Sequence, residues 1–371
     1  MSGTSLDGAD GVLVDFSASP RVLAYASRGF SADFRQELLA LNTPGTNELH
    51  RAALAAQTLV AVYAEVVSEL QAQALEQHAG PIRAIGAHGQ TVRHRPQEFG
   101  GSGYTLQLNN PALLAELTSL DVVADFRTAD LAAGGQGAPL VPAFHASLWA
   151  EPGRSVAVLN IGGISNLTLL PAQGLVRGFD CGPGNALLDH WCEQHTGQPF
   201  DQAGAWAASG RIHSGLLQAL LDQPFFSQPP PKSTGRDLFN PAWLQAKLAS
   251  IQAPLEPADV QASLTAMSAQ ACARDLLTWA PDTQSLLVCG GGALNRTLMQ
   301  HLQAALPGIS VRPTDDAGLP VMQVEAAAFA WLAKAWCDRQ PASLPAVTGA
   351  RGARVLGALY PASDAVTTGP A

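Results

Sequence analysis

The amino-acid sequence predicts an α/β protein built of two lobes. Its 371 residues exceed what one core usually organises, since domains commonly run to roughly 100–200 residues. Both halves follow the same order: a hairpin with a glycine-containing turn, a third strand, then helices alternating with strands. That alternation is typical of α/β domains. We therefore expect an N-terminal lobe at 1–150, a C-terminal lobe at 151–345 and a C-terminal segment with a frayed tail at 346–371, with a cleft between the lobes.

In the first half, residues 11–16 and 22–27 are rich in Val, Leu and aromatics and predict a hairpin. Apolar residues at helical spacing predict a long helix over 47–78. Asn110 followed by Pro111 is typical of a helix start. Short strands are expected around this start, at 83–88, 104–108 and 121–125.

In the second half, three strands are expected at 155–161, 165–170 and 175–179, with a helix from about 183 to Gly197. Asn240 and Pro241 predict another helix start. The later elements are a long helix at 257–280, a buried strand at 285–289 and a helix from Asn295.

Composition excludes several classes of protein. With 21 basic and 30 acidic residues the net charge is −9, which does not suit a nucleic-acid binder. The five cysteines show no zinc spacing and no disulfide framework, as expected in a reducing cytosol. The N-terminus lacks a signal peptide, and the apolar stretch 52–75 contains Gln and Glu, so it predicts an amphipathic helix rather than a membrane span. We expect a soluble cytoplasmic protein without nucleic-acid or membrane partners.

Three glycine-rich turns are candidate phosphate sites, at 2–8 (SGTSLDG), 160–166 (NIGGISN) and 289–295 (CGGGALN). Glycine leaves backbone N–H groups free to converge on a phosphate, and Ser or Thr hydroxyls add donors. Each turn taken alone is more simply explained by ordinary hairpin geometry. The first two occupy matching places in the two halves, whereas neither a P-loop nor a G-x-G-x-x-G motif occurs. Together the turns indicate a nucleotide fold of another type.

Asp180 is the candidate general base. It ends the strand predicted at 175–179 and precedes a predicted helix, whose N-terminus would hold the carboxylate ionised. Such a carboxylate can accept a proton from water or a hydroxyl. The alternative is a helix cap.

Polar side chains after the strands of the first half are candidates for a hydroxylated ligand. Arg127 suits a substrate carboxylate, or else forms a structural pair with Asp125 or Asp130. The segment 232–236 (KSTGR) is basic and either neutralises phosphate or is simply solvated. Glu325, at the start of an apolar helix, is either a cap or a further polar group near the nucleotide. The candidate substrate residues are His88, Gln90, Thr91, Arg127, Asp130, Gln136 and Glu325.

Long segments of the chain closely resemble the anhydro-N-acetylmuramic acid kinase family, within the actin-like ATPase and sugar-kinase superfamily. They include MSGTSLDGAD (1–10), GAHGQTVRHRP (86–96), the stretch 121–145, LNIGGISNLTLL (159–170) and RGFDCGPGNALLD (177–189). PPKSTGRDLFN (230–240), LVCGGGALN (287–295) and VEAAAFAWLA (324–333) extend the match over nearly the whole chain.

The resemblance implies two actin-like (RNase H-like) lobes with an ATP cleft between them, and Asp180 as catalytic base. It implies ATP with Mg²⁺ held by ATP and a carboxylate, no dedicated metal site, and a homodimer. The implied nucleotide-binding residues are Gly3, Thr4, Ser5, Leu6, Asp7, Gly8, Ala9, Asp10, Gly162, Gly163, Gly290, Gly291, Gly292 and Asn295. Family members carry a short apolar strand before the first glycine turn, and this sequence starts at the turn, so we expect the natural start upstream.

The implied reaction opens 1,6-anhydro-N-acetylmuramic acid with water, and transfers the γ-phosphoryl group of ATP to O6. It gives N-acetylmuramate 6-phosphate and ADP in peptidoglycan recycling. Two alternatives stay open: a plain sugar or acid kinase of the same fold, and a non-catalytic actin-like ATP-binding module.

Overall fold

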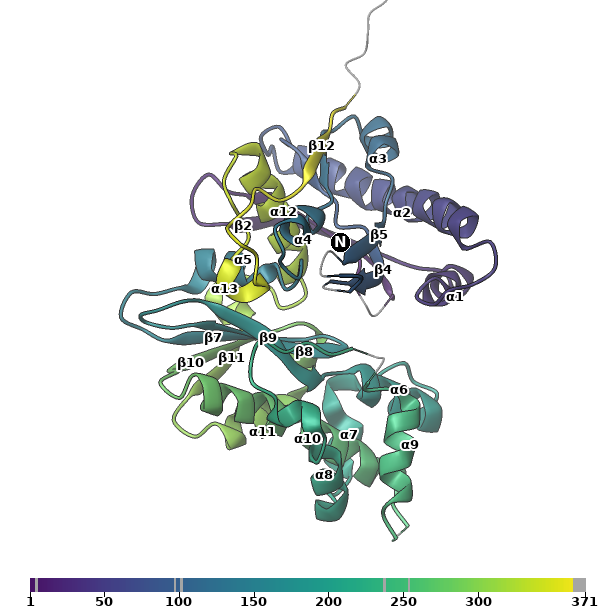
Figure 1. The fold of residues 1–371 in the computed structure, drawn as a ribbon, viewed down its shortest axis with the longest axis vertical. Helices are drawn as coiled ribbons and strands as arrows, with labels where there is room; N and C mark the ends of the chain where they lie inside the picture. The colour runs from purple at the N-terminus through teal and green to yellow at the C-terminus, as the bar shows by residue number, and fades with distance from the viewer. Residues whose placement is uncertain (4–5, 97, 101–102, 236–237, 253, 363–371) are drawn as a thin grey trace, which may run out of the picture. The chain divides into compact units, whose positions relative to one another are not determined.

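The chain folds into two compact units (Figure 1). The computed structural model describes residues 1–3, 6–96, 98–100, 103–235, 238–252 and 254–362. Unit 1 comprises Met1–Phe144 and Glu325–Ala371, and unit 2 comprises His145–Val324. The predicted division was therefore wrong for 145–150, which was assigned to the N-terminal lobe but belongs to unit 2, and for 325–345, which was assigned to the C-terminal lobe but belongs to unit 1.

Unit 1 contains three small sheets. Strand β1 pairs antiparallel with β2, β4 pairs antiparallel with β5, and β6 lies between β3 (parallel) and β12 (antiparallel). The strands are β1 (Gly8–Asp15), β2 (Arg21–Gly29), β3 (Ile85–Gly86), β4 (Gln90–Arg95), β5 (Tyr104–Leu108), β6 (Val122–Ala124) and β12 (Ala358–Tyr360).

The helices of unit 1 are α1 (Ala32–Ala40), α2 (Glu48–Glu76), α3 (Pro111–Thr118), α4 (Thr128–Ala132), α5 (Val141–Trp149), α12 (Val324–Cys337) and α13 (Pro345–Thr348), of which α5 and α12 extend across the unit boundaries. By length and composition α2 is apolar enough to cross a membrane. Leu59, Val60 and Tyr63 of α2 are buried in the core with Ala9, Ala24 and Ala26 of the β1–β2 hairpin. This packing is that of a core helix in a folded domain.

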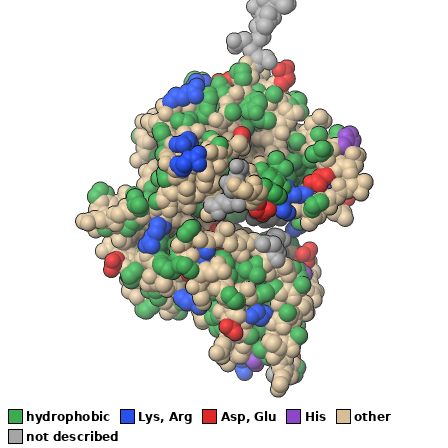
Figure 2. Space-filling view, viewed as in Figure 1, with side chains coloured by type: hydrophobic (Ala, Val, Ile, Leu, Met, Phe, Trp, Pro, Cys, Tyr) green, Lys and Arg blue, Asp and Glu red, His purple; other side chains and the backbone are tan. Residues whose placement is uncertain are grey.

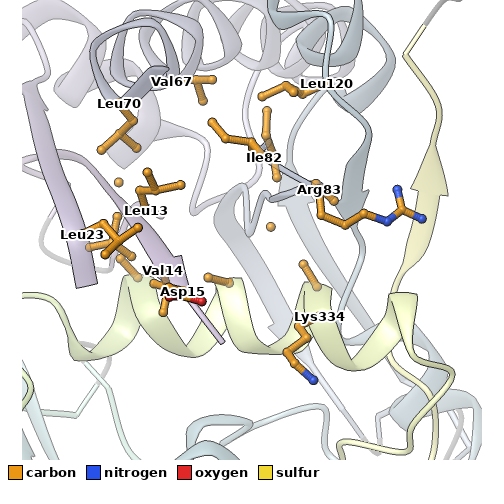
Figure 3. A pocket seen from close by; sticks show the side chains of 18 of the residues that line it. Leu13, Val14, Asp15, Leu23, Val67, Leu70, Ile82, Arg83, Leu120 and Lys334 are labelled. Carbon is orange, nitrogen blue, oxygen red and sulfur yellow. The ribbon is translucent and has the colours of Figure 1, made fainter. Parts of the chain in front are cut away.

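A cavity of about 930 Å³ separates β1 from β3. Figure 3 shows Leu13 and Leu23 facing Ile82 across it, with Leu70 of α2 and Lys334 of α12 also lining it. The cavity thus lies between two strand edges and between two helices. The strand expected ahead of the first glycine turn stays a prediction.

Unit 2 is built on one five-stranded sheet with the order β11-β10-β7-β8-β9. Strands β7, β10 and β11 are parallel, while β8 runs antiparallel to both β7 and β9. The strands are β7 (Val156–Ile161), β8 (Ile164–Leu170), β9 (Arg177–Pro183), β10 (Ser285–Cys289) and β11 (Ser310–Pro313).

The helices of unit 2 are α6 (Ala186–Thr196), α7 (Ala205–Ser209), α8 (Ser214–Leu221), α9 (Pro241–Ala249), α10 (Pro257–Trp279) and α11 (Arg296–Ala305). Short 3₁₀ turns are η1 (Gln202–Gly204), η2 (Pro224–Ser227), η3 (Gly291–Leu294) and η4 (Thr314–Ala317). Residues Ala269, Cys272 and Leu276 of α10 join Leu298 and Leu302 of α11 in the core with β7, β8 and β10.

The two units share a strand arrangement, except at the centre. In unit 2, β7 lies between the antiparallel β8 and the parallel β10. In unit 1, β1–β2 matches β8–β9 and β3–β6 matches β10–β11 in direction, with the cavity between β1 and β3. These strand pairs therefore run in the same directions in both units, whereas the predicted order of hairpin and third strand is not repeated in the same form.

Candidate active site

In unit 2 the two glycine-rich turns lie against each other. Gly162 and Gly163 connect β7 to β8, and Gly290 follows β10, which pairs directly with β7. A Cβ on Gly290 would lie 2.5 Å from Asn160 Oδ1 and 2.7 Å from the carbonyl oxygen of Ile161. Because these distances are shorter than any normal contact, only glycine fits where the turns meet.

The start of α6 completes this region. The N–H of Asn185 donates to the carbonyl of Gly162 (2.8 Å), and the N–H of Gly184 donates to the carbonyl of Gly163 (3.0 Å). The side-chain amide of Asn185 donates to the carbonyl of Ile161 at 3.2 Å. Three backbone segments distant in sequence thus converge at the ends of β7 and β10, where parallel strands of α/β proteins commonly present ligand sites.

Asn295 is engaged elsewhere. Its Oδ1 accepts a hydrogen bond from the N–H of Leu298 at 3.0 Å, which makes it the N-cap of α11. The side chain is buried, and it packs closely on Gly204. The cap occupies the acceptor Oδ1, and the expectation that Asn295 binds nucleotide stays a prediction.

Asp180 lies inside a strand rather than at its end. Strand β9 runs on to Pro183, and Asp180 pairs with Asn166 of β8. Its Oδ2 accepts the N–H of Thr234 at 2.9 Å, and its own N–H donates to the carbonyl of Lys232 at 3.0 Å. The expectation of a carboxylate held by a helix N-terminus was therefore wrong.

Burial decides the charge state of Asp180. It raises the pKa to about 6, against the hydrogen bond from Thr234 and the charge of Lys232, which both lower it. A carboxyl group with this pKa is mostly ionised at pH 7 and accepts a proton more readily than an ordinary aspartate. The electrostatics therefore suit a general base.

Lys232 is buried rather than solvated. Its Nζ lies 2.9 Å from both carboxylate oxygens of Asp275, and the two side chains are 1% and 5% exposed. The rings of Phe179 and Phe225 lie 5.9 Å and 5.0 Å from the ammonium group. Both earlier interpretations, phosphate neutralisation and a solvated loop, are wrong for this residue. Arg236, of the same basic segment, lies outside the described residues.

In unit 1 the N-terminal segment reaches β1 sooner than expected. Gly8, Ala9 and Asp10 are already in β1, and the carboxylate of Asp10 accepts the hydroxyl of Tyr25 at 2.6 Å. Of the remaining predicted nucleotide residues, Gly3, Leu6 and Asp7 lie before the strand, whereas Thr4 and Ser5 lie outside the described residues.

His88 and Arg127 form a buried polar pair. Nη2 of Arg127 lies 2.9 Å from Nε2 of His88, and Nη1 donates to the carbonyl of Gly137 at 2.7 Å. Burial, together with the charge of Arg127, lowers the pKa of His88 well below 6.5, so the ring is neutral and Nε2 is the acceptor. The proton then resides on Nδ1, which is buried without a partner among the described residues. Sequence reasoning named both residues, but not their pairing.

Arg127 does not pair with Asp125 or Asp130. Burial lowers the pKa of Arg127 to about 10, and the opposing influence is the charge of Glu325. Glu325 is the second residue of α12 and has an exposed side chain. The alternative interpretation, a structural pair with Asp125 or Asp130, was therefore wrong, and the carboxylate whose charge acts on Arg127 is on α12 instead.

Asp130 has a structural role. It is fully buried, and its two oxygens accept the N–H of Gly137 at 2.8 Å and the hydroxyl of Thr348 at 2.8 Å. The neighbouring Gln136 donates its N–H to the carbonyl of Thr348 at 2.8 Å. We correct the expectation that Asp130 contacts substrate, because its carboxylate fixes the turn that carries Gln136 and Gly137.

Gln90 and Thr91 begin β4 on the chain beside His88. Gln90 Nε2 donates to the carbonyl of Gly3 at 3.2 Å, and its Oε1 is buried without a partner in the described part of the chain. Thr91 accepts the side-chain amide of Gln107 at 3.2 Å. Ser2 belongs to the first glycine-rich turn but was not among the predicted site residues. Its hydroxyl bonds that of Tyr63 at 2.9 Å and donates to the carbonyl of Gly89 at 3.2 Å.

Charged side chains are scattered over the face shown in Figure 2, and Lys and Arg do not gather there into one patch. Among residues 1–3, 6–96, 98–100, 103–235, 238–252 and 254–362, no group of three or more His, Cys, Asp or Glu is placed to hold a metal ion.

Glycine turns that meet at strand ends, beside a strand carrying a partly buried carboxylate, are features that α/β phosphotransferases use to hold phosphate and activate an acceptor. The model of the anhydro-N-acetylmuramic acid kinase family matches residues 1–362. The chain belongs to this family.

Several curated relatives carry that family name. The protein from Variovorax paradoxus is 62% identical over 368 residues, covering 98% of each chain. That from Albidiferax ferrireducens is 59% identical over 383 aligned residues, again covering 98% of each. That from Cupriavidus pinatubonensis is 57% identical over 97% of each. The predicted family and enzyme class are thereby confirmed, and the mixed strands and helices of both units confirm an α/β fold.

Solved structures align more distantly. The activator of the 2-hydroxyisocaproyl-CoA dehydratase from Clostridium difficile, with bound ADPNP, aligns with a TM-score of 0.43 and 9% identity, over 91% of this chain and 100% of that one. A ROK family glucokinase from Streptomyces griseus, in complex with glucose and AMPPNP, aligns with a TM-score of 0.35 and 12% identity, over 88% and 98%.

Proposed function

We propose that this protein is an ATP-dependent kinase that opens 1,6-anhydro-N-acetylmuramic acid and phosphorylates it on O6. The products are N-acetylmuramate 6-phosphate and ADP. The observation that carries the proposal is the match to the anhydro-N-acetylmuramic acid kinase family over residues 1–362. The geometry of Asp180 supports it, since the reaction needs a base that activates water.

Asp180 is the residue we assign to that step. Thr234 holds Oδ2, and Oδ1 accepts a proton from water as the water oxygen bonds to the anomeric carbon. The bond from that carbon to O6 breaks, and O6 takes the γ-phosphoryl group while ADP leaves. The proton on Asp180 passes to solvent. General-base catalysis of this kind contributes roughly 10²–10⁴-fold to the rate.

Unit 1 supplies groups suited to the sugar. His88 offers a buried N–H at Nδ1, and Gln90 offers a buried carbonyl at Oε1. Arg127 has five N–H donors, of which His88 and Gly137 engage three. A remaining donor pair is suited to the carboxylate of the substrate.

The glycine turns supply the ATP site in this proposal. Turns without side chains allow backbone N–H groups to approach phosphates closely. At Gly290 the packing of the neighbouring turn also requires glycine. Mg²⁺ would arrive with ATP and neutralise phosphate charge, and it needs only one or two protein carboxylates. Asp7 and Asp10 fit that need, because they flank the first glycine turn. We also propose a cytoplasmic homodimer that acts in peptidoglycan recycling.

Isotope labelling tests the reaction. The protein is incubated with ATP, the anhydro-sugar and ¹⁸O-water, and the product is analysed by mass spectrometry. One labelled oxygen on the anomeric carbon is expected. A phosphorylated product without label would indicate a plain kinase of the same fold. ATP turnover that ignores the sugar would indicate a non-catalytic actin-like module and would refute the proposal.

A further inference from the structure

The buried pair of Lys232 and Asp275 lies next to the proposed base, Asp180, whose N–H donates to the carbonyl of Lys232. Lys232 belongs to the segment that precedes α9, whereas Asp275 lies on α10. Their side chains are only 1% and 5% exposed. Ionic pairs this deeply buried stabilise folds poorly compared with apolar packing, because both charges lose their hydration. The fold alone therefore does not explain why a charge pair is placed here.

The backbone of the Lys232 segment clamps Asp180 at two points. The carbonyl of Lys232 accepts the N–H of Asp180 at 3.0 Å, and the N–H of Thr234 donates to Asp180 Oδ2 at 2.9 Å. Two residues of one segment thus fix both the backbone and the carboxylate of the base. Any shift of Lys232 would move the hydrogen-bond donor on Thr234.

Asp275 contacts this segment through its ion pair with Lys232. Its oxygens each lie 2.9 Å from Lys232 Nζ. The charged groups packed here are Lys232 from the segment and Asp275 and Arg274 from α10, of which Arg274 lies over the ring of Phe226. Strand β8 presents the amide of Asn166 opposite Asp180. The ammonium group is thus the near positive charge that favours an ionised Asp180.

We propose that Lys232 and Asp275 are positioning residues for Asp180: the pair locks the 232–234 segment onto the carboxylate, and the Lys232 charge keeps it ionised. This role rests on the proposed function of Asp180 as the base. A purely structural role would leave the pH dependence of turnover unchanged, whereas the positioning role makes that dependence vary with the Lys232 charge.

The test compares Lys232→Met with the double variant Lys232→Met/Asp275→Leu. The double variant replaces the ion pair by apolar side chains, so we expect its urea midpoint to return toward that of the wild type. Its turnover should remain at least about tenfold reduced, since displacement of a catalytic group is costly. The acid limb of its kcat–pH profile should lie at higher pH than in the wild type, with KM for ATP little changed. Lys334→Met, which removes the exposed pair with Asp338 on α12, is the matched control and should change none of these.

Two results would overturn the inference. A stable double variant with the wild-type acid limb and kcat would show that the pair serves only the fold. Asp180→Asn, measured in parallel, separates this from the proposed function. If Asp180→Asn is inactive and the double variant is normal, only the positioning role fails; if Asp180→Asn turns over at the wild-type rate, both fail.

Discussion

Replacing Gly290 by alanine tests whether the two glycine turns of unit 2 pack as closely as the structure shows. Gly290 has φ 79° and ψ 177°, a region that side-chain-bearing residues rarely adopt and that costs about 1–3 kcal/mol. A methyl group there would lie 2.5 Å from Asn160 Oδ1, and relief of such overpacking costs typically about 1–3 kcal/mol. We therefore expect Gly290→Ala to lower the free energy of unfolding by about 2–6 kcal/mol.

Urea denaturation followed by tryptophan fluorescence measures the loss. Gly308→Ala is the control, because Gly308 also has positive φ (86°) but a methyl group there meets nothing within 4 Å. The control should lose only the backbone part, about 1–3 kcal/mol. Gly290→Ala should also raise KM for ATP, whereas Gly308→Ala should not. Equal losses of stability in the two variants would refute the close approach of Gly290 to β7.

Three further predictions follow from the polar groups and the cavity. Asp180→Asn should lower kcat by about 10²–10⁴-fold. In the wild type, kcat should fall as pH drops through about 6, because burial raises the pKa of Asp180 to that value and protonation removes the base. An acid limb of the kcat–pH profile near pH 4 would contradict this. Arg127→Lys should raise KM for the anhydro-sugar about tenfold or more, since lysine cannot contact His88 and Gly137 together; an unchanged KM in steady-state kinetics would argue against a substrate role. A chain lengthened ahead of Met1 by six alternating apolar residues should melt several degrees higher than one lengthened by six Gly and Ser. The added apolar strand can fill the cavity beside β1, whereas Gly and Ser offer no apolar side chains to fill it. Equal melting temperatures by calorimetry would count against a strand in the cavity.

Local signals predicted many elements closely. Asn110 and Asn240, each followed by proline, are N-caps whose side chains accept the N–H three residues on, at 3.1 Å and 2.9 Å. The strands β5 and β10 have the predicted bounds. These features depend on neighbours in the sequence, so the sequence suffices to predict them.

Boundaries set by pairing with distant strands were less predictable. The strand expected at 83–88 is only Ile85–Gly86, and β4 (Gln90–Arg95) follows where no strand was expected. Strand β9 continues through Asp180 to Pro183 because β8 offers partners over that whole length. A strand's end is decided by its partner, which local pattern does not reveal.

The sequence by itself determined the family, the alternation of strands and helices, the glycine turns and the identity of Asp180 as candidate base, because each is a pattern of residues adjacent in the sequence. Only the tertiary structure decided which charged side chains are buried and which partners they have. It buried Lys232 against Asp275, paired Arg127 with His88 rather than with Asp125 or Asp130, and placed Thr234 on the carboxylate of Asp180. The physical reason is that burial and hydrogen-bond partners come from segments far apart in the chain, and these set whether a charged side chain is solvated, structural or poised for chemistry.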